Sequence, residues 1–223
     1  MPSLSGLTKV VAVAKNYAAH AVEMGGSGAR AAAPLFFLKP ASSVIRPGGS
    51  VVKPRAVSEL HHEVELGVVI GTRCRRAAAR DWRRFVSGYV VALDMTARDL
   101  QAAAKAAGQP WTAGKCWDTF SALSEVLPPS AVGDPHALEL WLAVDGVQRQ
   151  RGSTSGMLHR IPELLEAISA VMTLEPGDVI LTGTPEGVGP VEPGSIITAG
   201  ITGLVEVAFP VGAEEEVEGG GAR

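Results

Sequence analysis

The sequence predicts an α+β fold that is mainly β, with a few helices attached to it. Eight short segments are rich in β-branched and aromatic residues and are bounded by Gly, Pro, Asp or Ser, which is the composition of strands. Helical periodicity is confined to four segments, and these do not alternate regularly with the strands. A doubly wound parallel sheet requires that alternation, so it is the less favoured architecture.

The expected strands follow one another at 10–14, 34–38, 64–70, 85–94, 138–145, 178–184, 195–201 and 204–211. The expected helices are 16–24, 79–85, 96–108 and 161–173. Pro162 supports the start of the last helix, because a residue in the first turn needs no N–H for the helix. We expect a mobile connector at 25–34, an N-terminal tail at 1–7, a single domain at 8–211 and a flexible acidic tail at 212–223.

Composition narrows the class of partner and compartment. The 223 residues carry a formal net charge of -3, which gives no general attraction to nucleic acid or to an anionic membrane. Cys74 and Cys116 lack CxxC spacing, which fits a reducing compartment. The N-terminus lacks a secretion signal, no stretch reaches the roughly 18 apolar residues of a membrane span, and no Arg precedes position 30 as a presequence would require. We therefore expect a soluble protein that is not exported.

Two carboxylates occur in an otherwise apolar strand, in HHEVELGVVI. Side chains alternate along a strand, so Glu63 and Glu65 share one face. The plain interpretation is a polar face exposed to water; the alternative is that the two anions hold a divalent cation, which would relieve their repulsion. Oxygen ligands favour Mg²⁺, Mn²⁺ or Ca²⁺ over zinc. His61 and His62 point to opposite faces, so they cannot both join the acids.

A third acid, Asp94, ends the apolar strand in GYVVALDMTARDLQ. It is a candidate for the same site or for the N-cap of the following helix, a position that Thr96 could also fill. Arg98 and Gln101 are three residues apart in that helix and share one face. They are either candidate site residues or simply exposed.

Three further segments contain candidate catalytic groups. His20 and Glu23 share a helix face, where the carboxylate would hold Nδ1 of the histidine and leave Nε2 as a general base; the alternative is a surface ion pair. The glycines after Met24 would let this helix move as a lid. Lys115, in a loop, could stabilise an enolate or an oxyanion, or be an exposed lysine. The loop TGTPEGVGP offers Thr184 and free N–H groups but no nucleotide-binding motif.

Taken together, these segments resemble the fumarylacetoacetate hydrolase family, in particular its small acylpyruvate hydrolase and oxaloacetate decarboxylase branch. The resemblance covers residues 8–211 and is carried, in the family's order, by NYAAH-x-x-E, FFLKP, HHEVELGVVIG, GYVVALDMTARDLQ, W-T-x-x-K and GDVILTGTPEGVGPV. Three positions, in two segments, depart from the family pattern. Ala14 stands where a Gly usually precedes the [RK]NY motif, and Gly114 and Cys116 flank the lysine in place of the usual residues. These departures concern the shape of the loops.

The resemblance implies a β-sandwich roll, a homodimer and a catalytic domain that holds a divalent metal, of which Mg²⁺ is the first candidate. Residue by residue it implies metal ligands Glu63, Glu65 and Asp94; catalytic residues His20, Glu23 and Lys115; and substrate-binding residues Arg98, Gln101 and Thr184. Lys39, in FFLKP, also matches a family motif but receives no role. Animal members of this branch are mitochondrial, so both the cytoplasm and the mitochondrial matrix stay open.

The implied reaction is cleavage of a C–C bond in a 2-oxo acid with release of pyruvate, by hydrolysis of an acylpyruvate such as acetylpyruvate or fumarylpyruvate, by decarboxylation of oxaloacetate, or both. The metal would polarise the 2-oxo group and stabilise the departing enolate. The first alternative is a keto–enol tautomerase or isomerase of the same family. The second is a non-enzymatic interaction protein in which a metal merely links strands, but His20, Glu23 and Lys115 would then have no reason to accompany the acids.

Overall fold

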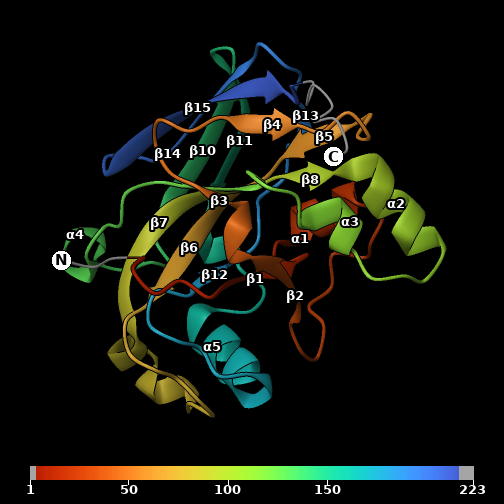
Figure 1. The fold of residues 1–223 in the computed structure, drawn as a ribbon. Helices are drawn as coiled ribbons and strands as arrows, with labels where there is room; N and C mark the ends of the chain where they lie inside the picture. The colour runs from red at the N-terminus through yellow and green to blue at the C-terminus, as the bar shows by residue number, and fades with distance from the viewer. Residues whose placement is uncertain (1–3, 216–223) are drawn as a thin grey trace, which may run out of the picture.

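The computed structural model describes residues 4–215, which form two β-sheets packed on a common core (Figure 1). The seven-stranded sheet has the order β2 (Leu35–Pro40), β1 (Lys9–Ala14), β12 (Val179–Leu181), β6 (Val64–Ile70), β7 (Val86–Asp94), β9 (Ser121–Leu123) and β3 (Val44–Ile45). The five-stranded sheet has the order β11 (Val147–Ser153), β10 (Glu139–Val144), β14 (Ile196–Ile201), β15 (Val205–Ala213) and β4 (Val51–Lys53). The prediction of a mainly β fold is confirmed.

Short elements surround these sheets. A small sheet joins β13 (Gly189–Pro190), β5 (Leu60–His62) and β8 (Thr96–Ala97). The helices are α1 (Ala18–Glu23), α2 (Arg98–Ala106), α3 (Thr112–Lys115), α4 (Pro129–Val132) and α5 (Ile161–Val171), and the 3₁₀ turns are η1 (Ala41–Ser43), η2 (Ala79–Phe85) and η3 (Thr154–Gly156). Helices α1, α2 and α3 gather at one end of the seven-stranded sheet, whereas α5 and η2 lie at the opposite side of the molecule (Figure 1). The site described below lies at the end with the three helices.

The core explains why the apolar strands fold as they do. Alternate residues of β6 and β7, such as Leu66 and Val91, are fully buried against Leu140, Ile197 and other residues of the five-stranded sheet. The intervening residues, such as Val69, join a second cluster on the other face of the seven-stranded sheet. Both faces of β6 are therefore covered, which is why its sequence is almost continuously apolar.

Several expected elements differ from the structure. Segment 79–85 forms a 3₁₀ turn, and the helix expected at 96–108 begins only at Arg98, because Thr96 and Ala97 pair in β8. The N-cap of α2 is Ala97 and no side chain caps it, so neither capping hypothesis for Asp94 and Thr96 holds. Lys115 ends a short helix instead of lying in a loop.

The ends of the chain are only partly described. Leu4 and Leu7, in the expected N-terminal tail, pack on the second core cluster. Strand β15 continues through Gly212 and Ala213, into the segment expected as an acidic tail, while residues 216–223 of that segment lie outside the described range.

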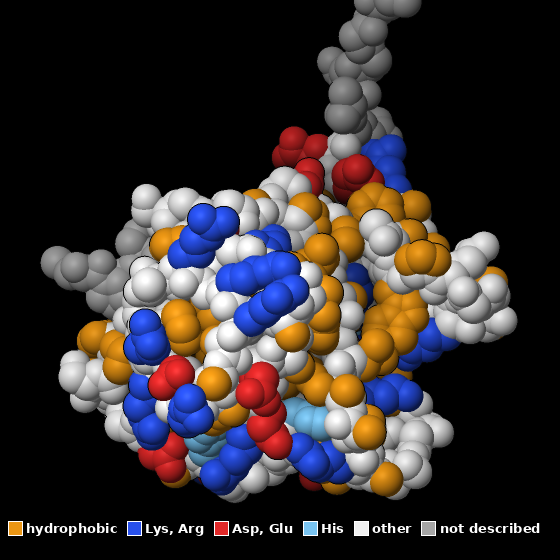
Figure 2. All heavy atoms as spheres, turned by 90° about the horizontal axis from the view of Figure 1, so that it is seen from below, with side chains coloured by type: hydrophobic (Ala, Val, Ile, Leu, Met, Phe, Trp, Pro, Cys, Tyr) orange, Lys and Arg blue, Asp and Glu red, His pale blue; other side chains and the backbone are white. Residues whose placement is uncertain are grey.

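No helix within residues 4–215 is both long enough and apolar enough to cross a membrane. The face seen from below the view of Figure 1 carries basic, acidic and apolar side chains side by side (Figure 2). That face is therefore not uniformly basic.

Candidate active site

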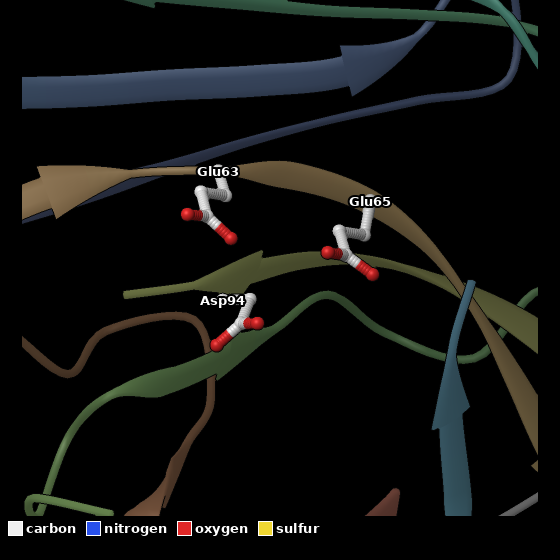
Figure 3. Close-up of side chains that lie close together, drawn as sticks. All are labelled: Glu63, Glu65 and Asp94. Atoms are coloured by element: carbon white, nitrogen blue, oxygen red, sulfur yellow. The ribbon is translucent and has the colours of Figure 1, made fainter. Parts of the chain in front are cut away.

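Three carboxylates converge where strands β5, β6 and β7 meet, and their positions follow from strand pairing. Val64 pairs with Leu93 across β6 and β7, and the N–H of Asp94 donates to the carbonyl of Glu63 at 2.9 Å. The end of β7 thus lies directly beside the start of β6. Glu63, Glu65 and Asp94 lie close together on these strands (Figure 3), and each offers an oxygen within 4.8 Å of the others. The sequence prediction that these acids form one cluster agrees with this geometry.

The cluster is buried. Glu63, Glu65 and Asp94 are only 5%, 1% and 2% exposed. A polar strand face open to water, the plain interpretation of the two glutamates, is therefore excluded. Charged side chains are almost never this deeply buried unless they are paired or bind metal.

Three cations approach the same carboxylates. The Nζ of Lys115 donates to Glu63 Oε2 at 3.0 Å and to Asp94 Oδ2 at 2.8 Å. Arg98 forms a short ion pair with Glu63, and the fully buried Lys39 forms one with Asp94. Lys39 also donates to the carbonyl of Phe120 at 2.7 Å. Lys39, to which the sequence analysis gave no role, therefore positions Asp94.

Glu63 and Glu65 have opposite electrostatic environments. Burial opposes the ionisation of Glu63, but the charges of Lys115 and Arg98 outweigh it and hold its pKa well below the ordinary value. Burial, together with the charges of Asp94 and Glu63, raises the pKa of Glu65 well above the ordinary value. One hydrogen bond, from the N–H of Gly183 at 2.6 Å, works against that rise. Glu65 is therefore the carboxylate for which a cation would bring the largest gain.

The residues present fit a divalent metal ion. All three candidate ligands are carboxylates, which are hard oxygen donors preferred by Mg²⁺, Mn²⁺ and Ca²⁺. Their spacing lets one ion contact an oxygen of each carboxylate. Because the surroundings of Glu65 disfavour its charged form, a bound cation would stabilise that form. The histidines do not contribute. His62 is turned to Gln150, with Nδ1 and Oε1 3.0 Å apart, and His61 lies by Arg98.

His20 lines the site and is held by Glu23. His20 is buried, and its Nδ1 lies 3.1 Å from Glu23 Oε2, as the three-residue spacing predicted. The other carboxylate oxygen of Glu23 accepts the N–H of Gly187 at 3.0 Å. With Nδ1 bound to an acceptor, the imidazole proton is held there and Nε2 is the basic nitrogen. No described residue makes a hydrogen bond to Nε2, and His20 lines the same pocket as Glu63 and Lys115.

Helices α2 and α3 supply another part of the wall of the same pocket, through Arg98, Gln101 and Lys115. Arg98 donates to Gln101 Oε1 at 2.7 Å, so the two residues share a helix face as expected. Gly114 permits the close approach of α3, because a Cβ at that position would lie 2.8 Å from the Cβ of Gln101. This approach brings Lys115 to the acids. Burial opposes its protonation, but the charges of Asp94 and Glu63 prevail and raise the pKa of Lys115, so it is a cation.

Beside this polar pocket lies an apolar one of about 350 Å³. The two share Phe37, Trp111 and Lys115 in their walls, and the remaining wall of the apolar pocket includes Leu35 and Pro110. Phe37 and Trp111 contact each other edge to face, with ring centroids 5.7 Å apart. The apolar pocket could hold a hydrophobic or extended part of a ligand whose polar end is bound by the acids and bases.

Thr184 does not line the polar pocket. Its hydroxyl donates to the carbonyl of Val64 at 2.8 Å and accepts from Gln150 Nε2 at 2.8 Å. The same Gln150 accepts the N–H of Val64 at 3.0 Å, so its amide links the loop of Thr184 to the strand that carries the glutamates. Sequence reasoning missed Gln150. Its neighbours in the polar edge strand β11 gave no signal that it is the buried one.

Comparisons with known proteins identify the family of the chain. The family model described as "Fumarylacetoacetate (FAA) hydrolase C-terminal" matches residues 9–212. An Arabidopsis thaliana protein, "Oxaloacetate tautomerase FAHD1, mitochondrial", is 55% identical over 204 residues, which are 92% of this chain and 91% of that protein. A Dictyostelium discoideum protein, "Oxaloacetate decarboxylase, mitochondrial", is 50% identical over 197 residues, or 88% of this chain and 89% of that one.

A solved structure is also similar to this chain over nearly its whole length. The crystal structure of fumarylpyruvate hydrolase from Pseudomonas aeruginosa, in complex with Mn²⁺ and pyruvate, superposes with a TM-score of 0.87 at 37% identity and covers 93% of this chain and 91% of that one. The family model spans nearly the whole chain, and the named relatives are enzymes that act on 2-oxo acids. This chain belongs to the fumarylacetoacetate hydrolase family of enzymes.

Proposed function

We propose that this enzyme interconverts the enol and keto forms of oxaloacetate. The observation that carries the proposal is the pairing, in one pocket, of a histidine base with cations and buried carboxylates. Tautomerisation requires a proton to leave or reach C3 while negative charge gathers on the oxygen of C2, and these groups serve those two needs. The name of the relative that is 55% identical supports this choice over the C–C cleavage that the sequence analysis put first.

His20 is the proposed base. Its Nε2 takes a proton from C3 of the keto form, and the C2 oxygen of the resulting enolate gains a proton from solvent to give the enol. In the reverse direction the C2 hydroxyl loses its proton to solvent and Nε2 returns one to C3. Glu23 accepts a hydrogen bond from the Nδ1–H of His20. This bond keeps the ring in that tautomer, and the carboxylate stabilises the imidazolium that forms. Its second oxygen is fixed by the N–H of Gly187, so the carboxylate cannot rotate away from the ring.

The cations hold and stabilise the substrate. Arg98 and Gln101 present N–H groups on one helix face and are proposed to bind the C1 carboxylate. The ammonium of Lys115 stabilises negative charge on the oxygen of C2, which is greatest in the enolate-like transition state. A divalent ion held by Glu63, Glu65 and Asp94 would supply further Lewis-acid polarisation of the 2-oxo group. Thr184 is proposed to act only through its backbone, since its hydroxyl is occupied.

A second candidate is the C–C bond cleavage that releases pyruvate. The apolar pocket of about 350 Å³ favours it, because a tautomerase for oxaloacetate alone has no use for that space, whereas an acylpyruvate hydrolase would place the acyl group there. The same His20 and Glu23 pair would then activate water for attack on the distal carbonyl. The names of the decarboxylase and hydrolase relatives support this second activity.

The two activities separate in one experiment with the purified protein and Mg²⁺. Loss of the enol absorbance of oxaloacetate, faster than the spontaneous rate and without pyruvate, would support the tautomerase. Pyruvate detected by a coupled dehydrogenase from oxaloacetate, acetylpyruvate or fumarylpyruvate would support cleavage. His20→Gln should lose whichever activity is present, whereas Glu206→Gln, an exposed substitution on β15, should keep it. Acceleration of neither reaction would refute the proposed function.

We further propose a homodimer and a mitochondrial matrix location. The edge strand β2 leaves Leu35 and Leu38 about half exposed, at 56% and 47%, which suits contact with a second copy. Light scattering of the protein and of Leu38→Ser tests the dimer: the variant should shift toward monomer. The location rests on the names of the plant and Dictyostelium relatives and is tested by imaging a tagged protein.

A further inference from the structure

Two lysines line the active-site pocket and take no part in the machinery described above. Lys15 directly follows β1, and Lys105 lies in the last turn of α2. Within residues 4–215 neither side chain makes an ion pair or a hydrogen bond to a carboxylate. Lys105 lies over the ring of Trp111, 5.2 Å from its centroid. The other four lysines of the described chain all contact an acidic residue: Lys9, Lys39, Lys53 and Lys115.

Lys15 has a strained backbone conformation. Its φ of 54° is in the left-handed region, which a lysine adopts only at the expense of strain. Its ammonium is directed toward the glycine turn that follows α1, where a Cβ on Gly26 would lie 3.8 Å from Nζ. Such strain in a non-glycine residue often marks a functional position.

The two lysines also repel each other and their neighbours. Burial lowers the pKa of Lys105, and the charges of Arg98 and Lys15 lower it further. Deeper in the site, the three carboxylates are matched by Lys39, Arg98 and Lys115, so they offset the charge of the outer lysines only in part, with Glu63 acting on Lys105. The mouth of the pocket therefore carries excess positive charge that an anionic ligand group would neutralise.

We propose that Lys15 and Lys105 form a subsite for a second carboxylate, so that the preferred substrates are 2-oxo acids with an anionic group at the end remote from C1. This inference rests on the proposed function, since it assigns the far end of a substrate whose C1 carboxylate and 2-oxo group occupy the inner site. Trp111 serves the subsite by holding the ammonium of Lys105 over its ring. The two lysines bind substrate and take no part in the proton transfer.

The test compares two substrates that differ at the far end. Oxaloacetate carries a second carboxylate where acetylpyruvate carries an acetyl group, and both enolise. Enol loss and pyruvate release are measured for wild type, Lys15→Gln, Lys105→Gln and the double variant, with Lys15→Arg and Lys105→Arg as charge-preserving controls. Arg75→Gln removes one positive charge from an exposed loop outside the pocket and controls for net charge.

We expect each glutamine variant to raise KM for oxaloacetate about tenfold, with kcat and the KM for acetylpyruvate nearly unchanged, because a lost charge-assisted hydrogen bond has about that effect on binding. The arginine variants and Arg75→Gln should resemble wild type. Equal effects on both substrates, or none on either, would overturn the subsite while leaving the proposed function intact. Wild type that accelerates neither substrate would instead refute the proposed function on which the inference rests.

Discussion

Replacing Glu65 by glutamine should change stability in opposite directions with and without metal. The carboxylate is 1% exposed and lies against Glu63 and Asp94, and its hydrogen bond comes from the N–H of Gly183. Burial and the neighbouring acids raise its pKa, so the charged form costs folding free energy at any pH above its ordinary value of 4.5. Glutamine removes that charge, keeps the shape and leaves an oxygen to accept from Gly183. The metal-free variant should therefore be more stable than metal-free wild type.

The magnitude follows from two opposing terms. For each unit by which the pKa of Glu65 is raised, replacing the charged carboxylate by glutamine should add about 1.4 kcal/mol to the free energy of unfolding. The weaker hydrogen bond from Gly183 to the neutral amide should subtract roughly 0.5 kcal/mol. Each kcal/mol of net gain raises Tm by roughly 2–4 °C in a chain of this size. With metal at a hundred times its Kd, wild type should gain about 2.7 kcal/mol, or roughly 5–10 °C, a gain that the variant largely loses.

Thermal unfolding of both proteins with a chelator, with Mg²⁺ and with Mn²⁺ measures these shifts. Glu206→Gln makes the same chemical change at an exposed position and should behave as wild type throughout. If the metals stabilise Glu65→Gln as much as wild type, Glu65 is not a ligand. If the metal-free variant is less stable at neutral pH, the electrostatic account of the acid cluster is wrong.

Three other variants test the proton transfer, the cation and an acid-sensitive contact. Lys115→Met should lower kcat by roughly a hundredfold or more while the metal still raises Tm, and near-normal turnover would remove its catalytic role. Glu23→Gln should reduce kcat by about ten- to a hundredfold with an unchanged Tm, because Glu23 is part-exposed and acts through His20; an equal loss in Glu206→Gln would count against this. Burial and the charge of Arg98 lower the pKa of His61 from 6.5 to about 4, because both disfavour the protonated ring in the folded protein. The stability that neutral His61 allows is therefore fully present above pH 6.5 and is lost as the pH falls toward 4. In His61→Gln, the free energy of unfolding measured by chemical denaturation should fall less steeply over that pH range than in wild type. An identical pH dependence in the two proteins would refute the role of His61.

The strands predicted from the sequence are those whose pattern of apolar residues follows directly from burial in the core. Segment 64–70 is buried throughout in the structure, so its apolar run carried the information directly. Strand β11 was missed because it is an edge strand and most of its side chains are exposed, so no alternation remains to be read. The two-residue strands β3 and β8 are defined only by their partners. The seven residues of η2 are too few for a stable isolated α-helix, and 3₁₀ turns are common in such connectors.

The site was predictable to the extent that its geometry is local. Spacing of two along a strand placed the glutamates on one face, and spacing of three along a helix brought Glu23 to His20. The partners of the acids come from remote parts of the chain: 55 residues separate Lys39 from Asp94, and 35 separate Arg98 from Glu63. No local pattern encodes such contacts. A lysine inside the apolar segment FFLKP was nevertheless a signal, because a buried lysine requires an anion.

The balance of charge in the inner site links metal binding to substrate binding. Three carboxylates face three cationic side chains, so the protein groups alone are close to neutral in sum. A divalent ion leaves this buried site with an excess positive charge, and a buried excess charge is costly. The anionic C1 carboxylate, and the enolate oxygen that develops during reaction, remove that excess. Metal and 2-oxo acid should therefore strengthen each other's binding by the same factor, as linkage requires. The cations that pair with these acids should therefore make the affinity for the metal depend on the presence of an anionic substrate.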